Sequence, residues 1–219
     1  MAKGFPQDTM QKFHIGVSNN NDGELTIDGA DGILGIGPDA LSTYNNPDGV
    51  IIPTIVTSMY QAKIIHHNVF SVYFQPLEYD TKIKQVNGEL VLGGVNMSYV
   101  EGNVTYAPIS TNPDFSDYWA VDIDNIRTGS RTFTYPTKLV ALVDTGSTLI
   151  FLPAEIVQAV FKGVHGSRRD FTGQYIVPCD SDKLRSVNFT MGGVEYELYP
   201  EDYLITDGPV KFLFFVMIA

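Results

Sequence analysis

An acidic residue between two strongly apolar segments is the feature that most restricts how this chain folds. Residues 140–153 read Val-Ala-Leu-Val-Asp-Thr-Gly-Ser-Thr-Leu-Ile-Phe-Leu-Pro. We expect a strand, a tight turn and a second strand, with Gly146 allowing unusual backbone angles and a close approach of the backbone. Because its neighbours favour burial, the carboxylate of Asp144 should be buried, should be hydrogen-bonded or share a proton, and should have a shifted pKa. The pattern favours a catalytic carboxylate over an Asp that caps a hairpin turn.

Most of the remaining sequence has the signature of β-strands. Apolar runs bounded by turn residues predict strands over 69–74, 89–92 and 118–126, and a hairpin over 187–198. Alternation within the third run places Trp119, Val121 and Ile123 on one face, opposite Ala120, Asp122 and Asp124. Helical spacing occurs over 54–61 and 154–162, the second after Pro153. The sequence therefore predicts a mainly β protein with short helices.

The net charge and the absence of ligand motifs exclude several classes of partner. Lys and Arg number 14 against 25 Asp and Glu, a formal net charge of −11. A phosphate backbone or an anionic lipid surface would repel such a chain, so we expect no nucleic-acid and no membrane partner. The acidity indicates either a solvated surface or a protein suited to acidic surroundings. No metal-ligand spacing and no cofactor motif is present, so we expect neither a metal nor a cofactor.

Signals of cellular compartment point in two directions. The first residues, Met1–Pro6, lack the apolar core of a secretory signal. Three Asn-x-Ser/Thr sequons, at Asn96, Asn103 and Asn188, nevertheless suggest a secretory ancestry with glycosylation at these sites. The single cysteine, Cys179, cannot form a disulfide within the chain, and a catalytic thiol lacks a histidine placed by any motif.

The motif Asp144-Thr145-Gly146-Ser147 in its apolar frame resembles the second active-site motif of pepsin-like aspartic peptidases. Further segments resemble the same family in order and spacing: residues 31–37, 68–74, 88–94, 118–126 and 192–196. The resemblance covers about residues 8–208 and is closest to secreted fungal members. It implies a pepsin-like bilobal fold, incomplete at both ends, with a remnant of the N-terminal lobe over 1–94, a connection over 95–113 and a truncated C-terminal lobe over 114–219.

The resemblance also implies an endopeptidase mechanism. Two carboxylates about 3 Å apart share one proton, and the pair activates a water that attacks the peptide carbonyl. Asp144 would be one of the two. Gly146, Ser147 and Thr148 would hydrogen-bond the substrate backbone, while side-chain pockets would be lined by Leu142, Tyr118 and Ile33. The family implies a peptide or protein substrate, a monomeric protein, and an extracellular or vacuolar location.

The sequence departs from the family pattern at three points. The family requires an earlier Asp-Thr-Gly, a flap carrying a Tyr and a late apolar–apolar–Gly-Asp segment, none of which is found here. We therefore expect impaired catalysis, unpaired strand edges, exposed apolar surface and an unpaired Cys179, which in the family usually closes a disulfide. The alternatives are a non-catalytic fragment or peptide-binding half-cleft derived from a peptidase, and a β-rich carbohydrate-binding or structural module.

Overall fold

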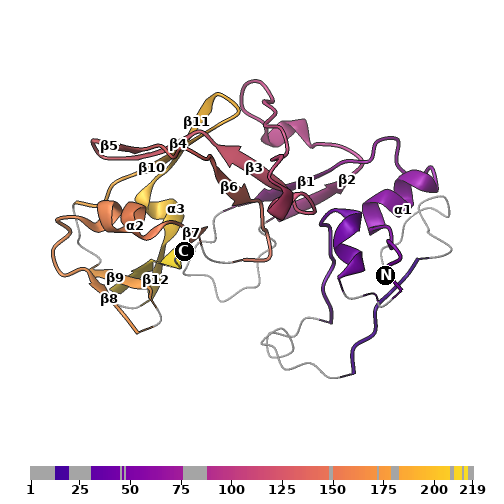
Figure 1. The fold of residues 1–219 in the computed structure, drawn as a ribbon, viewed down its shortest axis with the longest axis horizontal. Coiled ribbons are helices and arrows are strands. Elements are labelled where there is room, and N and C mark those ends of the chain that lie inside the picture. Colours follow the sequence, from indigo (N-terminus) through magenta and orange to yellow (C-terminus); the bar gives the residue numbers. More distant parts are fainter. Residues whose placement is uncertain are drawn as a thin grey trace. The chain divides into compact units, whose positions relative to one another are not determined.

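Two compact units, Met1–Val104 and Thr105–Ala219, make up the chain (Figure 1). The computed structural model describes residues 13–19, 31–44, 46, 48–75, 88–147, 150–171, 173–178, 183–207, 210–213 and 215–216, the last strands as backbone only. Within these residues strands outnumber helices, and most of the strands pair as antiparallel neighbours. The predicted mainly β class is confirmed.

The described residues of the first unit form short helices and one two-stranded sheet. Its elements are η3 (Asp39–Thr43), α1 (Ile55–Gln61), β1 (Phe70–Phe74), β2 (Gly88–Leu92) and η4 (Met97–Tyr99). Helix α1 begins after Thr54, whose hydroxyl accepts a hydrogen bond from Thr57 N, and Thr54 N itself donates to Asp39 Oδ1 at 2.8 Å. Strands β1 and β2 pair antiparallel from Phe70↔Leu92 to Phe74↔Gly88. The Thr54 hydroxyl therefore caps the start of α1, and the strand pairing holds β1 against β2.

The described residues of the second unit form several small sheets, two α-helices and one short 3-10 helix. Its elements are η5 (Pro113–Phe115), β3 (Ala120–Ile123), β4 (Asn125–Thr128), β5 (Arg131–Phe133), β6 (Leu139–Leu142), β7 (Ile150–Phe151), α2 (Ala154–Phe161), β8 (Arg168–Arg169), β9 (Tyr175–Pro178), β10 (Val187–Met191), β11 (Val194–Leu198), α3 (Pro200–Tyr203), β12 (Leu204–Asp207), β13 (Val210–Leu213) and β14 (Phe215–Val216). The two four-stranded sheets have the orders β11-β10-β4-β5 and β12-β13-β9-β8. Strand β3 pairs with β6, and β7 pairs in parallel with β14.

The hydrophobic core of the second unit surrounds α2. Helix α2 starts directly after Pro153, which suits the start of a helix because it needs no amide partner there. Ile156, Val157 and Val160 are almost completely buried, and they join Ile126 of β4 and Val187 of β10 in one cluster. The ring of Phe161 stacks on that of Tyr175, with centroids 4.5 Å apart. This core anchors the segment that follows the acidic turn.

Most predicted elements appear in the structure, with one run divided. The predicted helices correspond to α1 and α2, and the predicted hairpin to β10–β11, which pair from Val187↔Leu198 to Met191↔Val194. The run 118–126 is split into β3 and β4 at Asp124, whose N–H donates to Thr190 O at 2.8 Å. At the start of this run Ala120 is buried while the larger apolar Trp119 is 39% exposed, so burial does not follow residue size there. Ser110 N donates to Ala120 O, so a neighbouring segment covers that position.

Candidate active site

The acidic turn is attached to the end of the β3–β6 pair. Ala120 lies opposite Leu142 in the register of the two strands. The N–H of Val143 donates to the carbonyl of Trp119 at 2.8 Å, which extends the ladder by one residue before the chain turns at Asp144. After the turn, β7 leads through the buried Leu152 into α2. A strand pair on one side and the core helix on the other therefore hold the turn.

Both carboxylate oxygens of Asp144 accept hydrogen bonds from its own turn. The backbone N–H of Gly146 donates to Oδ1 at 2.9 Å, and the hydroxyl of Ser147 donates to Oδ2 at 2.6 Å. The Ser147 hydroxyl, followed by the Gly146 N–H, lowers the pKa of Asp144 below its ordinary value. Hydrogen bonds to a carboxylate favour its charged form. The turn thus holds an ionised carboxylate in a fixed orientation.

The expected burial of Asp144 is wrong. The residue is exposed, and its neighbours Leu142 and Val143 are 45% and 60% exposed. Apolar flanking residues favour burial only where another segment covers them, and within the described part of the second unit nothing covers this end of β6. The pKa shift arises from hydrogen bonding, and the small desolvation opposes it.

Gly146 is required for space and not for backbone conformation. Its φ lies outside the left-handed region, contrary to the expectation of unusual angles. A Cβ at this position would lie 3.2 Å from Asp144 Oδ1, which is closer than ordinary van der Waals contact. The predicted close approach is therefore present, and it is an approach to the carboxylate itself.

The other predicted substrate-binding residues are distributed unevenly. Half-buried Tyr118 precedes β3 at the end where Asp144 lies, and Leu142 is the last residue of β6, so both are near the turn. Ile33 is 79% exposed and belongs to the first unit. Thr148 lies outside the described residues. Ser147 donates its hydroxyl to Asp144, a partnership that the Asp-x-x-Ser spacing signals in the sequence and that the prediction of substrate binding missed.

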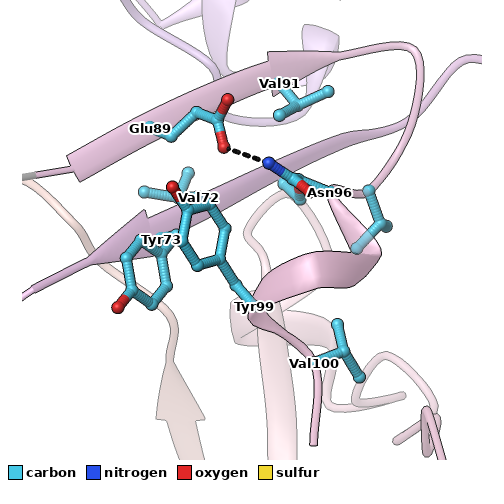
Figure 2. Close-up of a pocket in the computed structure, with 9 residues that line it drawn as sticks. Val72, Tyr73, Glu89, Val91, Asn96, Tyr99 and Val100 are labelled. Carbon is cyan, nitrogen blue, oxygen red and sulfur yellow. Dashed lines mark hydrogen bonds between the residues drawn. The ribbon is translucent and has the colours of Figure 1, made fainter.

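A small pocket of about 110 Å³ lies in the first unit, between β1, β2 and η4 (Figure 2). Figure 2 shows Glu89 and Asn96 pointing toward one another, and Asn96 Nδ2 donates to Glu89 Oε2 at 2.8 Å. The rings of Tyr73 and Tyr99 stack with centroids 3.9 Å apart. The pocket contains a single carboxylate, already hydrogen-bonded, so it does not resemble a site with paired acids.

The three sequons differ in their surroundings. Asn96 is half-buried, and its Oδ1 accepts hydrogen bonds from the N–H and hydroxyl of Ser98. Asn103 is exposed. Asn188 is only 3% exposed and donates to Glu195 Oε1 at 3.2 Å. A glycan on Asn188 has no room in the folded chain, so the structure argues against that site, while glycosylation at Asn96 and Asn103 stays a prediction.

The described residues contain neither a cluster of metal ligands nor a membrane-spanning helix. Within them, no group of three or more His, Cys, Asp or Glu side chains is arranged to hold a metal ion. No helix there has the length and apolar character needed to cross a bilayer. Cys179 lies outside the described part.

Comparison with known proteins gives consistent results for sequence and structure. Polyporopepsin of Irpex lacteus is 32% identical over 193 residues, which are 87% of this chain and 54% of that protein. Vacuolar protease A of Aspergillus fumigatus is 30% identical over 91% of this chain and 48% of its own length. Mouse (Mus musculus) cathepsin D is 32% identical over 80% of this chain and 39% of its own length. The chain spans about half the length of these curated relatives.

The crystal structure of an aspartic proteinase from Irpex lacteus superposes with a TM-score of 0.77 at 29% identity. The match covers 92% of this chain and 60% of that one, and it confirms the predicted pepsin-like fold. The family model described as eukaryotic aspartyl protease matches residues 6–211, slightly beyond the predicted end of the resemblance. The chain belongs to the eukaryotic aspartyl protease family.

Proposed function

We propose that this protein is an aspartic endopeptidase in which Asp144 is one of two catalytic carboxylates. The observation that carries the proposal is the exposed Asp-Thr-Gly turn, whose carboxylate is oriented by Gly146 and Ser147 at 2.9 and 2.6 Å. Catalysis of this class needs an acid fixed in position and open to a substrate. Family membership supports the reaction class.

Asp144 can perform one of the two roles that the proposed reaction requires, that of the general base. Its pKa is lowered, so at mildly acidic pH the side chain is an ionised base able to accept a proton from an attacking water. It carries no proton to donate to the developing oxyanion. A second carboxylate about 3 Å away would share a proton with Asp144 and supply that donor. Asp-Thr-Gly occurs once in the sequence given, so we expect the isolated chain to be impaired.

Substrate contacts are proposed around the same turn. Leu142 and Tyr118 lie at the end of the β3–β6 pair that leads into Asp144, and both have exposed surface. Their apolar parts suit a side-chain pocket for a peptide. Ile33 and Thr148 remain proposals from the family resemblance alone. The Ser147 hydroxyl donates its proton to the Asp144 carboxylate. Its oxygen would in addition accept a hydrogen bond from a peptide N–H of the substrate.

A non-catalytic peptide-binding role is the alternative. Both oxygens of Asp144 are already engaged within the turn, and this favours a structural role for the carboxylate. Exposed Leu142 and Val143 would then contact a peptide that is not cleaved. The two candidates differ in one measurable property, the dependence of proteolysis on the Asp144 carboxylate.

The test is an assay of acid proteolysis on denatured globin, with and without pepstatin. Wild-type protein is compared with Asp144→Asn, and Asp114→Asn, an exposed acid in η5, serves as the matched control. Pepstatin-sensitive activity, however weak, that Asp144→Asn removes and Asp114→Asn retains supports the proposal. Activity that is unchanged by Asp144→Asn overturns it. Pepstatin binding without any cleavage, measured by calorimetry, favours the peptide-binding alternative.

An acidic compartment is the proposed place of action. The net charge of −11 and the sequons at Asn96 and Asn103 support an extracellular or vacuolar protein, and the name of one relative places that relative in a vacuole. Proteins and peptides are the proposed substrates, and a monomer is the proposed form. The two units are proposed to correspond to parts of the two lobes of the family fold.

A further inference from the structure

Arg168 and Arg169 are the only two adjacent Lys or Arg residues in the sequence. They form β8, the edge strand of the sheet β12-β13-β9-β8 (Figure 1). Arg168 lies opposite Ile176 and Arg169 opposite Tyr175. Strand β8 pairs on one side only within the described structure, so its outer edge is available to another extended backbone.

The side chains of this pair have fewer charged partners than two other cations of the second unit, Arg127 and Lys138. Both arginines are exposed, and the side chain of Arg168 makes no hydrogen bond or ion pair with any residue that the structure describes. Among the described residues, Arg169 Nε donates to Gly173 O at 3.3 Å, an exposed contact. By contrast, Arg127 binds Glu195 at 2.7 Å, and Lys138 binds Asp124 at 2.6 Å.

The segment that follows the pair can open without disturbing the core. Phe171 is completely exposed, and Gly166 and Gly173, with φ of +75° and +95°, bracket the region. Three hydrogen bonds between described residues close the turn: Asp170 N donates to Gln174 O at 2.8 Å, Gln174 N donates to Asp170 Oδ1 at 2.9 Å, and Gly173 N donates to Asp170 O at 3.3 Å. Local openings that break few exposed hydrogen bonds cost little free energy, and such loops are preferred sites of proteolysis.

We propose that the peptide bond between Arg169 and Asp170 is a processing site for a serine endoprotease that requires paired basic residues. Such a protease binds its substrate as an extended strand and receives the two guanidinium groups in acidic pockets. Strand β8 supplies the extended backbone and both groups. Hydrolysis adds one water across the bond, leaving a carboxylate on Arg169 and an amino group on Asp170. This processing is independent of the proposed peptidase activity.

The cut produces two pieces that remain associated. Residues 1–169 retain the Asp144 turn and α2, and residues 170–219 retain β9 to β14. Strand β10 of the second piece pairs with β4 of the first, and Val177 and Val187 are fully buried in the core around α2. The Arg185 guanidinium also donates to carbonyls at the end of α2. The product is a two-fragment protein with an intact second unit.

The experiment is digestion of the folded chain with a subtilisin-like serine protease specific for paired basic residues. Mass spectrometry should find pieces 1–169 and 170–219, which elute together on gel filtration in native buffer and separate in denaturant. As a positive control, the urea-denatured chain is diluted into the same assay, where its cleavage shows that the protease recognises this sequence. A folded chain that stays intact over the time in which the denatured chain is fully cut overturns the proposal.

Substitutions separate local opening from global unfolding. The double variant Arg168→Gln/Arg169→Gln should resist cleavage, and Arg131→Gln, an exposed arginine in β5, should be cut at the wild-type rate. Val187→Ala weakens the core around α2, far along the chain from the cut bond. An unchanged cleavage rate in Val187→Ala supports local opening of the β8–β9 hairpin. A rate that rises in proportion to the loss of global stability contradicts it.

Discussion

At the scale of single residues, the hydroxyl of Ser147 is the main control on the charge of Asp144. Its hydrogen bond to Oδ2 is the largest cause of the lowered pKa, ahead of the Gly146 N–H. We expect Ser147→Ala to raise the pKa of Asp144 toward its ordinary value of 3.8. The measurement is a titration of the Asp144 carboxyl carbon by NMR. Ser116→Ala, which removes an exposed hydroxyl that donates to Pro113 O, should leave the titration unchanged.

The same bond makes stability depend on pH in a defined direction. A carboxyl whose pKa is lower in the folded state stabilises that state above the unfolded pKa, near 3.8. This contribution is lost as the pH falls from 3.8 through the lower folded pKa. The difference in unfolding free energy between wild type and Ser147→Ala should therefore shrink over that range. A difference that grows on acidification would contradict the assignment of this hydrogen bond to the ionised carboxylate.

The chemistry of the turn could be predicted from its residues, but its exposure could not. Asp144, Gly146 and Ser147 are neighbours in sequence, so their contacts follow from local spacing. Burial depends on segments that pack from elsewhere, and an apolar pattern alone does not show whether such a segment is present. For the same reason, the sequon motif at Asn188 gave no sign that β4 and β11 flank it on both sides.

At the scale of elements, the side chain of Arg185 caps the C-terminal end of helix α2. Its Nη1 donates to the carbonyls of Lys162, Ala159 and Val160 at 2.8, 3.3 and 3.4 Å. These carbonyls have no partner within the helix, and a cation at this end is favourable to the helix dipole. We expect Arg185→Ala to lower the free energy of unfolding by about 1–2 kcal/mol. Urea titration followed by circular dichroism measures the change.

Arg168→Ala is the matched control for this helix cap. Arg168 belongs to the same unit and is exposed, so its removal should change stability by no more than about 0.5 kcal/mol. Arg185→Lys keeps the charge but loses the planar donor group, and its stability should lie between those of wild type and Arg185→Ala. Equal effects of Arg168→Ala and Arg185→Ala would show that the cap is energetically unimportant.

Elements with a strong local signal were predicted well. The Gly192-Gly193 pair sets the β10–β11 hairpin, and both glycines adopt positive φ. Pro153 and the apolar spacing after it set α2. The parallel pairing of β7 with β14 was not predicted, because the expectation was a missing partner strand after the acidic turn. Parallel pairing joins distant segments, and short apolar runs do not specify which partner they choose.

At the scale of the whole molecule, the two units differ in how much core they contain. Among the described residues, every buried apolar side chain except Val56 belongs to Thr105–Ala219. The first unit has a two-stranded sheet, which by itself is only marginally stable in water. The second has β10 between β4 and β11, over the core around α2. The free energy of local opening should therefore be distributed unevenly along the chain.

Hydrogen exchange measures this distribution directly. Amides of β10 and α2 should exchange at least about tenfold more slowly than those of the β1–β2 pair, because they open only when the core opens. Val187 is fully buried, so Val187→Ala should accelerate exchange of the β10 and α2 amides, since it removes packing atoms from the core. Mass spectrometry of peptides from a pulse of deuterium resolves the regions. Equal protection of β1–β2 and β10 would show that apolar burial does not determine where this chain opens, and that another interaction stabilises its first unit.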